Sequence, residues 1–196
     1  MKSPVRAFIA INLPKQVATE LEPALEALNS GDVTGLRPVA AGAMHITLRF
    51  LGDVPAEGLE PISEAMSRAA HAVPEFRLRL GSYGAFPPEG PPRVLWVGLN
   101  GDIAAVRRLH ASLQEELSSL GHWPETRPFT PHITLARLAR NAGHADRRRA
   151  LQALKASGPG HADFEVGSLS LMASHLKTQG ANSGPRYEKL AVATLA

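Results

Sequence analysis

The chain of 196 residues contains no cysteine. Disulfide bonds, thiolate zinc sites and a cysteine nucleophile are therefore excluded. The sequence also lacks a run of about 18 apolar residues, which is the length that a membrane-spanning helix needs. The apolar run near the N-terminus is too short for a secretory signal. We expect a cytoplasmic protein with no membrane contact, and a monomer with no obligate protein partner, because no strong assembly signal is present.

Lysine is also scarce, since 5 of the 21 basic residues are Lys and 16 are Arg. The guanidinium group binds phosphate through two parallel hydrogen bonds, so this bias is compatible with a nucleotide or RNA substrate. Genomic base composition explains many of these arginines equally well, because the chain is also rich in Ala, Gly and Pro. The net charge of +3 is modest and does not demand a long RNA partner.

The tetrapeptide His-Ile-Thr-Leu occurs twice, at residues 45–48 and 132–135. In a β-strand, residues i and i+2 point to the same face, so each His shares a face with the Thr that follows it. One copy alone would most simply be a strand with a polar face. A duplication kept only for packing would preserve Ile and Leu, with less reason to preserve His and Thr. The repeat therefore predicts one site that contains His45, Thr47, His132 and Thr134.

Hydrophobic periodicity predicts an α+β fold. We expect residues 1–196 to form a single domain made of two pseudo-symmetric lobes, each an antiparallel sheet with helices on its outer face. The two H-x-T strands would line a cleft between the lobes. The stretch 81–92 is dense in Gly and Pro and is predicted to be a loop. The main strands are predicted at 7–13, 44–51, 76–80, 93–99, 132–138, 164–176 and 187–195, and the helices at 14–28, 55–72, 102–120 and 146–156.

The two motifs and their surroundings resemble the two-histidine phosphoesterase superfamily. The closest similarity is to its bacterial RNA 2',3'-cyclic phosphodiesterase branch, also called 2',5'-RNA ligase. The loop before Tyr187 is longer than is usual in that branch. The resemblance covers most of the chain and is carried by residues 6–14 (RAFIAINLP), 45–52 (HITLRFLG), 84–87 (GAFP), 92–96 (PRVLW), 129–137 (FTPHITLAR) and 170–174 (SLMAS).

The resemblance implies hydrolysis of RNA 2',3'-cyclic phosphate ends to 2'-phosphates without a metal or other cofactor. It further implies that His45 is the proton donor and His132 the proton acceptor, which the symmetric motifs alone do not distinguish. One neutral and one protonated imidazole can coexist near neutral pH. Thr47 and Thr134 are expected to donate hydrogen bonds to the phosphate. The same groups would join a cyclic phosphate end to a 5'-hydroxyl as a 2',5' linkage, without ATP.

The resemblance also implies that Arg137 clamps the phosphate. Arg137 lies five residues after His132, so strict alternation would direct it to the opposite face of the strand. This role therefore requires the strand to end or to bulge near Ala136. Arg49 has the correct alternation with His45 and is a secondary candidate.

Several alternatives remain open at this stage. Phe50, Trp96 and Phe129 are candidates for stacking on a base, although buried aromatic residues more often belong to a core. The arginines at 147–149 would form a solvated helix face or contact an RNA backbone. The same histidines could act on a small cyclic nucleotide or another non-RNA phosphoester. A non-catalytic RNA- or nucleotide-binding module is a third function, but a binding protein has no need of two proton-transfer groups. No P-loop sequence is present.

Overall fold

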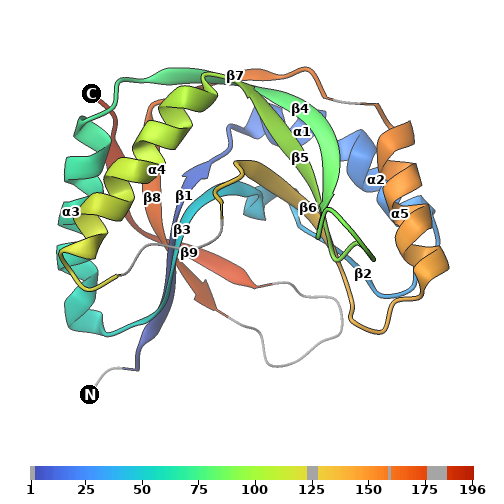
Figure 1. Ribbon diagram of the computed structural model, residues 1–196, viewed down its shortest axis with the longest axis horizontal. Coiled ribbons are helices and arrows are strands. Elements are labelled where there is room, and N and C mark those ends of the chain that lie inside the picture. The colour runs from blue at the N-terminus through green and yellow to red at the C-terminus, as the bar shows by residue number, and fades with distance from the viewer. Residues whose placement is uncertain (1–2, 123–127, 159, 176–184) are drawn as a thin grey trace.

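The computed structural model describes residues 3–122, 128–158, 160–175 and 185–196, which contain both strands and helices (Figure 1). No helix in this part of the chain is long and apolar enough to cross a membrane. The strands are β1 (Val5–Asn12), β2 (Leu36–Pro38), β3 (His45–Val54), β4 (Phe76–Phe86), β5 (Val94–Gly101), β6 (His132–Leu138), β7 (Asp163–Val166), β8 (Ser168–His175) and β9 (Arg186–Thr194). The α-helices are α1 (Lys15–Glu20), α2 (Glu22–Ser30), α3 (Leu59–His71), α4 (Ile103–Ser118) and α5 (His144–Ala156), and the 3-10 helices are η1 (Ala41–Ala43) and η2 (Ala56–Gly58).

The described strands form one antiparallel sheet in the order β7-β4-β5-β6-β3-β1-β8-β9, with β2 also paired to β6. The sheet has two halves, because β3 and β6 pair only through Ile46 and Ile133. We call them the β3 half (β1, β3, β8 and β9) and the β6 half (β2, β4, β5, β6 and β7). The two antiparallel sheets expected from the sequence are therefore the two halves of one sheet, joined at the two H-x-T strands.

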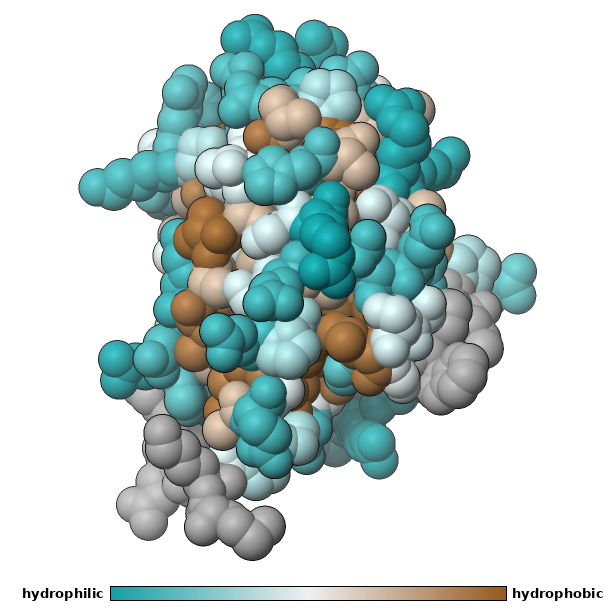
Figure 2. All heavy atoms as spheres, turned by 90° about the vertical axis from the view of Figure 1, so that its left-hand side faces the viewer, coloured by the Kyte–Doolittle hydropathy of each residue, from teal (hydrophilic) through white to brown (hydrophobic). Residues whose placement is uncertain are grey.

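Helices cover the outer face of each half, as predicted for this α+β fold (Figure 1). Helices α3 and α4 pack together over the β3 half, and α2 and α5 pack together beside the β6 half. The flank formed by α3 and α4 exposes mostly hydrophilic side chains with scattered hydrophobic ones (Figure 2). We call the sheet face that these helices leave uncovered the inner face.

The helices that connect the strands exchange sides. Helices α1 and α2 follow β1 of the β3 half but lie beside the β6 half, whereas α4 follows β5 of the β6 half and packs over the β3 half. Apolar residues spaced three or four apart bury one stripe of α4 against the sheet. These residues are Ala105, Val106, Leu109, Leu113 and Leu117.

Three sequence-based assignments were wrong. The single helix predicted at 14–28 is two helices, α1 and α2, which meet at Leu21, because Pro23 has no N–H with which to continue the first helix. Strand β4 continues to Phe86, through the first part of the predicted loop at 81–92. It does so because Gly84 leaves room for the Trp96 ring, since a Cβ there would lie 2.3 Å from that ring. The predicted strand at 164–176 is in fact two strands, β7 in the β6 half and β8 in the β3 half, which meet at Gly167.

Candidate active site

A β-bulge in β6 brings Arg137 to the inner face. Trp96 of β5 pairs with Thr134, and Leu95 pairs with Ala136, so Leu135 is an extra residue in the β6 strand. Leu135 and Ala136 are both fully buried, and Arg137 then emerges exposed. The bulge that the sequence argument required near Ala136 is therefore present.

Strand β3 contains a bulge at the equivalent position. Ala10 pairs with Thr47 and Ile9 with Arg49, which leaves Leu48 as the extra residue. Arg49 is consequently buried on the face opposite His45, at 5% exposure. Burial lowers the pKa of His122, and the charge of Arg49 lowers it further. The alternation argument that favoured Arg49 was wrong because it assumed a regular strand.

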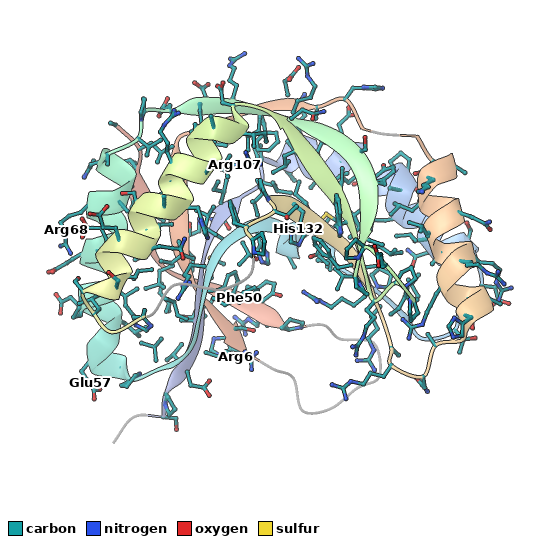
Figure 3. All side chains as sticks on the ribbon, in the orientation of Figure 1. Arg6, Phe50, Glu57, Arg68, Arg107 and His132 are labelled. Carbon is teal, nitrogen blue, oxygen red and sulfur yellow. The ribbon has the colours of Figure 1, made fainter. Side chains whose placement is uncertain are left out.

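The residue that replaces Arg49 on the inner face is Phe50. It follows the β3 bulge as Arg137 follows the β6 bulge, and its side chain is 58% exposed. Figure 3 shows Phe50 and His132 between the two helical flanks, whereas Glu57 and Arg68 lie on the outer side. The duplicated motif thus presents an aromatic side chain in one half and a cation in the other.

The pairing of β3 with β6 arranges the motif residues as four corners of one surface. Since the pairing is antiparallel and centred on Ile46 and Ile133, His45 lies across from Thr134, and Thr47 lies across from His132. The two histidines therefore occupy one diagonal and the two threonines the other. Diagonal neighbours on one face of such a pair are about 7–8 Å apart, which leaves room for a small anion between the imidazoles.

Each imidazole is anchored by the carbonyl two residues before it. The Nδ1–H of His45 donates to the Ala43 carbonyl at 2.8 Å, and that of His132 donates to the Thr130 carbonyl at 2.7 Å. A carbonyl oxygen only accepts, so Nδ1 carries the hydrogen in both rings. Nε2 is then the nitrogen available to a substrate, as a lone pair when the ring is neutral and as an N–H donor when it is protonated.

Aromatic rings hold both imidazoles in place. Beside His45, the Phe8 ring centroid lies at 4.9 Å and the Tyr187 ring meets it edge-on at 5.2 Å. Beside His132, the Phe86 ring meets it edge-on at 5.0 Å, and the Trp96 ring is 6.0 Å away. These contacts restrict ring rotation in the two halves by similar means.

The same physical causes lower the pKa of both histidines below the usual value of 6.5. For His45 the largest is burial; the hydrogen bond to Ala43 opposes it, and the charges of Arg137 and His132 lower the pKa further. For His132, burial again lowers the pKa, the Thr130 carbonyl raises it, and Arg137 lowers it. The electrostatics of the free protein therefore do not distinguish an acid from a base.

Arg137 acts electrostatically on both halves of the sheet. Besides the two histidines, it affects Tyr187, whose pKa is raised by burial and lowered by the Arg137 charge. Tyr187 was not identified as a site residue from the sequence, because it is remote in the chain and carries no motif. Asn12, the strand partner of His45, was also missed, and its Nδ2 donates to the Ser170 hydroxyl at 2.6 Å.

The remaining candidates have structural surroundings. Phe129 stacks on His110 with ring centroids 3.9 Å apart, and Trp96 lies against Phe86. Arg147 is buried and donates to the carbonyls of Pro92, Ala139, Arg140 and Ala142. Arg147 therefore holds the turn after β6 and is not available to contact RNA. Arg148 and Arg149 are exposed.

The site lies on the inner face of the sheet, where aromatic rings pack against both imidazoles and Arg137 supplies a positive charge. Two hollows in the described structure, of about 290 and 380 Å³, lie elsewhere and are lined by neither histidine. Among the residues with described positions, no group of three or more His, Cys, Asp or Glu side chains is placed to hold a metal ion.

Known proteins share both this fold and this sequence pattern. The RNA 2',3'-cyclic phosphodiesterase of Archaeoglobus fulgidus is 32% identical over 189 residues, which are 96% of this chain and 99% of that protein. The Escherichia coli protein of the same name is 34% identical over 142 residues, or 72% of this chain and 77% of that protein.

Crystal structures extend the similarity to three dimensions. A Thermus thermophilus protein matches with a TM-score of 0.76 and 30% identity over 97% of both chains. Escherichia coli LigT complexed with 3'-AMP matches with a TM-score of 0.72 and 28% identity over 98% of both chains. The sequence profile of the 2'-5' RNA ligase superfamily matches residues 14–178. With the two H-x-T strands placed together, this match confirms the resemblance seen in the sequence, and the chain belongs to the 2'-5' RNA ligase superfamily.

Proposed function

We propose that this protein hydrolyses the 2',3'-cyclic phosphate at RNA ends to a 2'-phosphate, with His45 as proton donor and His132 as proton acceptor. The observation that carries the proposal is the diagonal placement of two imidazoles, each anchored through Nδ1, beside Arg137. The relatives named RNA 2',3'-cyclic phosphodiesterase support the same substrate.

In the proposed reaction, water attacks the phosphorus from the side of His132, and Nε2 of His132 takes the proton of that water. The bond between phosphorus and O3' breaks, and protonated His45 gives the proton on its Nε2 to O3'. The product carries a 2'-phosphate and a 3'-hydroxyl, and the two histidines have exchanged protonation states. Diagonal corners suit this exchange, because entering and leaving oxygens lie on opposite sides of phosphorus in an in-line displacement.

The neighbouring side chains bind the substrate. The hydroxyls of Thr47 and Thr134, at the other two corners, donate to non-bridging phosphate oxygens, and Arg137 neutralises the charge that develops there. Phe50 lies on the same face and is the exposed aromatic that a base attached to this phosphate would meet. Because the bound phosphate is anionic, it offsets Arg137 and raises the pKa of the histidine that must be protonated.

We further propose that residues 1–196 work as one domain, because the helices exchanged between the halves make each depend on both parts of the chain. The enzyme would act as a monomer without a cofactor. It would work in the cytoplasm, where RNA ends arise. If a 5'-hydroxyl replaces the attacking water, the same proton transfers form a 2',5' linkage.

The test is hydrolysis of an oligoribonucleotide that ends in a 2',3'-cyclic phosphate, assayed in excess chelator. His45→Ala and His132→Ala are assayed in parallel, and the product is distinguished as a 2'- or 3'-phosphate. The proposal expects a 2'-phosphate, no effect of the chelator and loss of activity in both variants. Turnover that survives either substitution, or a 3'-phosphate product, contradicts it.

A further inference from the structure

A second arginine stands directly opposite Arg137. Strand β2 pairs with the end of β6 so that Arg37 faces Arg137, with Leu36 opposite Leu138 on one side of this pair and Pro38 opposite Ala136 on the other. Leu138 and Ala136 are buried in the core, so the side chains between them point to the inner face. Arg37 and Arg137 therefore share the face that carries the histidines, and both are exposed.

Like charges directly opposite each other in a sheet are destabilising. No carboxylate in the described part of the chain lies within 4.0 Å of Arg37 or Arg137 to offset the repulsion. Another arginine of the sheet has a partner of opposite charge: Arg79 faces Asp163 across β4 and β7, and their side chains form an ion pair at 2.7 Å. An arginine pair that no carboxylate of the described residues neutralises is suited to bind an anionic ligand.

The two arginines lie beside each other on neighbouring strands. Arg137 is on the histidine strand β6, and its charge adds to the effect of burial in lowering the pKa of His45 and of His132. Arg37 is on β2, which pairs with the same edge of β6 as β3 does, at the end of the site away from the Ile46–Ile133 pair. A single phosphate at the histidine pair would engage Arg137 and leave Arg37 without a counter-charge.

The backbone around Arg37 is fixed before any ligand arrives. The Val39 N–H donates to the carbonyl of the bulged Leu135 at 2.8 Å, and the Ala139 N–H donates to the Gly35 carbonyl at 2.9 Å. These bonds tie both ends of β2 to the strand that carries His132 and Arg137. A guanidinium presented from a held strand loses less conformational entropy on binding than one on a loose loop.

We infer that Arg37 binds the phosphodiester that precedes the cyclic phosphate, so that the site favours the end of an RNA chain over a mononucleotide. This inference rests on the proposed function, in which Arg137 holds the cyclic phosphate itself. Arg137 and Arg37 would then bind two consecutive phosphates of one RNA strand. This arrangement would distinguish RNA ends from small cyclic nucleotides, the first two substrate classes considered from the sequence.

The test compares adenosine 2',3'-cyclic phosphate, which has no phosphodiester on its 5' side, with the dinucleotide ApA ending in the same group, which adds one phosphodiester and one adenosine. Arg37→Ala is expected to reduce kcat/KM about tenfold for the dinucleotide, in keeping with the loss of one charged hydrogen bond. The mononucleotide should change less than about twofold, and the effect on the dinucleotide should weaken as salt is raised. Arg37→Lys should restore part of the loss, and Arg148→Ala, an exposed arginine on α5, serves as the matched control.

Equilibrium titration of the matching 2'-phosphate products with wild type and Arg37→Ala gives the same comparison without turnover. Equal losses on both ligands, or no loss on either, would overturn the inference. If the wild type turned over neither substrate, the proposed reaction would fail, while the titration would still decide whether Arg37 reads the added phosphodiester. The unfolding midpoint of Arg37→Ala should not fall, because the substitution removes a repulsion.

Discussion

The β3 half and the β6 half use the same local design up to one residue and then diverge. In both, a His and a Thr share a face, Nδ1 is held by the carbonyl two residues earlier, and a bulge follows the Thr. After the bulge, the β3 half presents Phe50 and the β6 half presents Arg137. The duplicated residues are suited to symmetric proton transfer. The position that differs, Phe50 in one half and Arg137 in the other, is suited to determine which way round a substrate binds.

The histidines that the two halves share are expected to give the largest loss of activity. His45→Ala and His132→Ala should each reduce kcat by about 1,000-fold, because each removes one of two coupled proton transfers. The double variant should be little worse than either single variant, since groups that act as a unit are strongly non-additive. Single-turnover rates measure this directly. A double variant slower by the product of the two single losses would show two independent contributions instead of one site.

Arg137, the residue after the bulge in the β6 half, is expected to give the second-largest loss of activity. Arg137→Ala should lower kcat/KM about 100-fold through loss of charge stabilisation at the phosphate, with partial recovery in Arg137→Lys. Arg49→Met is the matched control, because Arg49 follows the other bulge but is buried on the outer side. That variant should change the free energy of unfolding and leave kcat/KM within about threefold. A larger kinetic effect from Arg49 than from Arg137 would reverse the assignment of faces.

The diverged position in the β3 half predicts a smaller effect, confined to substrates with a base. Phe50→Ala should raise KM about tenfold for adenosine 2',3'-cyclic phosphate, as expected for loss of one stacked base. A methyl riboside 2',3'-cyclic phosphate, which has no base, should be unaffected. Phe50→Trp should preserve KM, and Val192→Ala, at another exposed apolar position, is the control. An equal effect on the two substrates would argue against stacking.

The smallest expected effect concerns stability and pH. Both histidines have a pKa below 6.5 in the folded chain, so below pH 6.5 the unfolded chain binds more protons than the folded one. Stability should therefore be fully present above pH 6.5 and fall as the pH drops toward the lowered values. Replacing both residues, as His45→Gln and His132→Gln, should flatten this acidic slope in denaturant titrations. A slope that is unchanged or steeper in the double variant would contradict the direction of the shifts.

The sequence predicted those features of the site that follow from the alternation of side chains along a strand. The two H-x-T faces, the α+β class and the need for a bulge near Ala136 all follow from a period of two residues and the position of Arg137. The bulge in β3 was missed because nothing in the residues after Thr47 distinguishes a bulge from a regular strand. Arg49 was therefore assigned to the wrong face, and the significance of Phe50 as the counterpart of Arg137 was not seen.

Other features depend on contacts between distant segments. Tyr187 reaches His45 only because β9 pairs with β8 and β8 pairs with β1. Arg147 lies in a run of three arginines that is typical of a solvated helix face, yet it is buried and donates to three carbonyls after β6 and to the Pro92 carbonyl in the loop before β5. Local pattern does not reveal either arrangement, because the partners are set by the tertiary fold.

In the proposed reaction, two nearly identical motifs perform opposite proton transfers. A cyclic phosphate end with sulfur in place of O3' separates the two roles, because a thiolate leaves without protonation. We expect this substrate to restore much of the activity of His45→Ala and none of that of His132→Ala, as measured by single-turnover cleavage. Equal rescue of both variants, or rescue of His132→Ala alone, would contradict the assigned division of roles between the two halves.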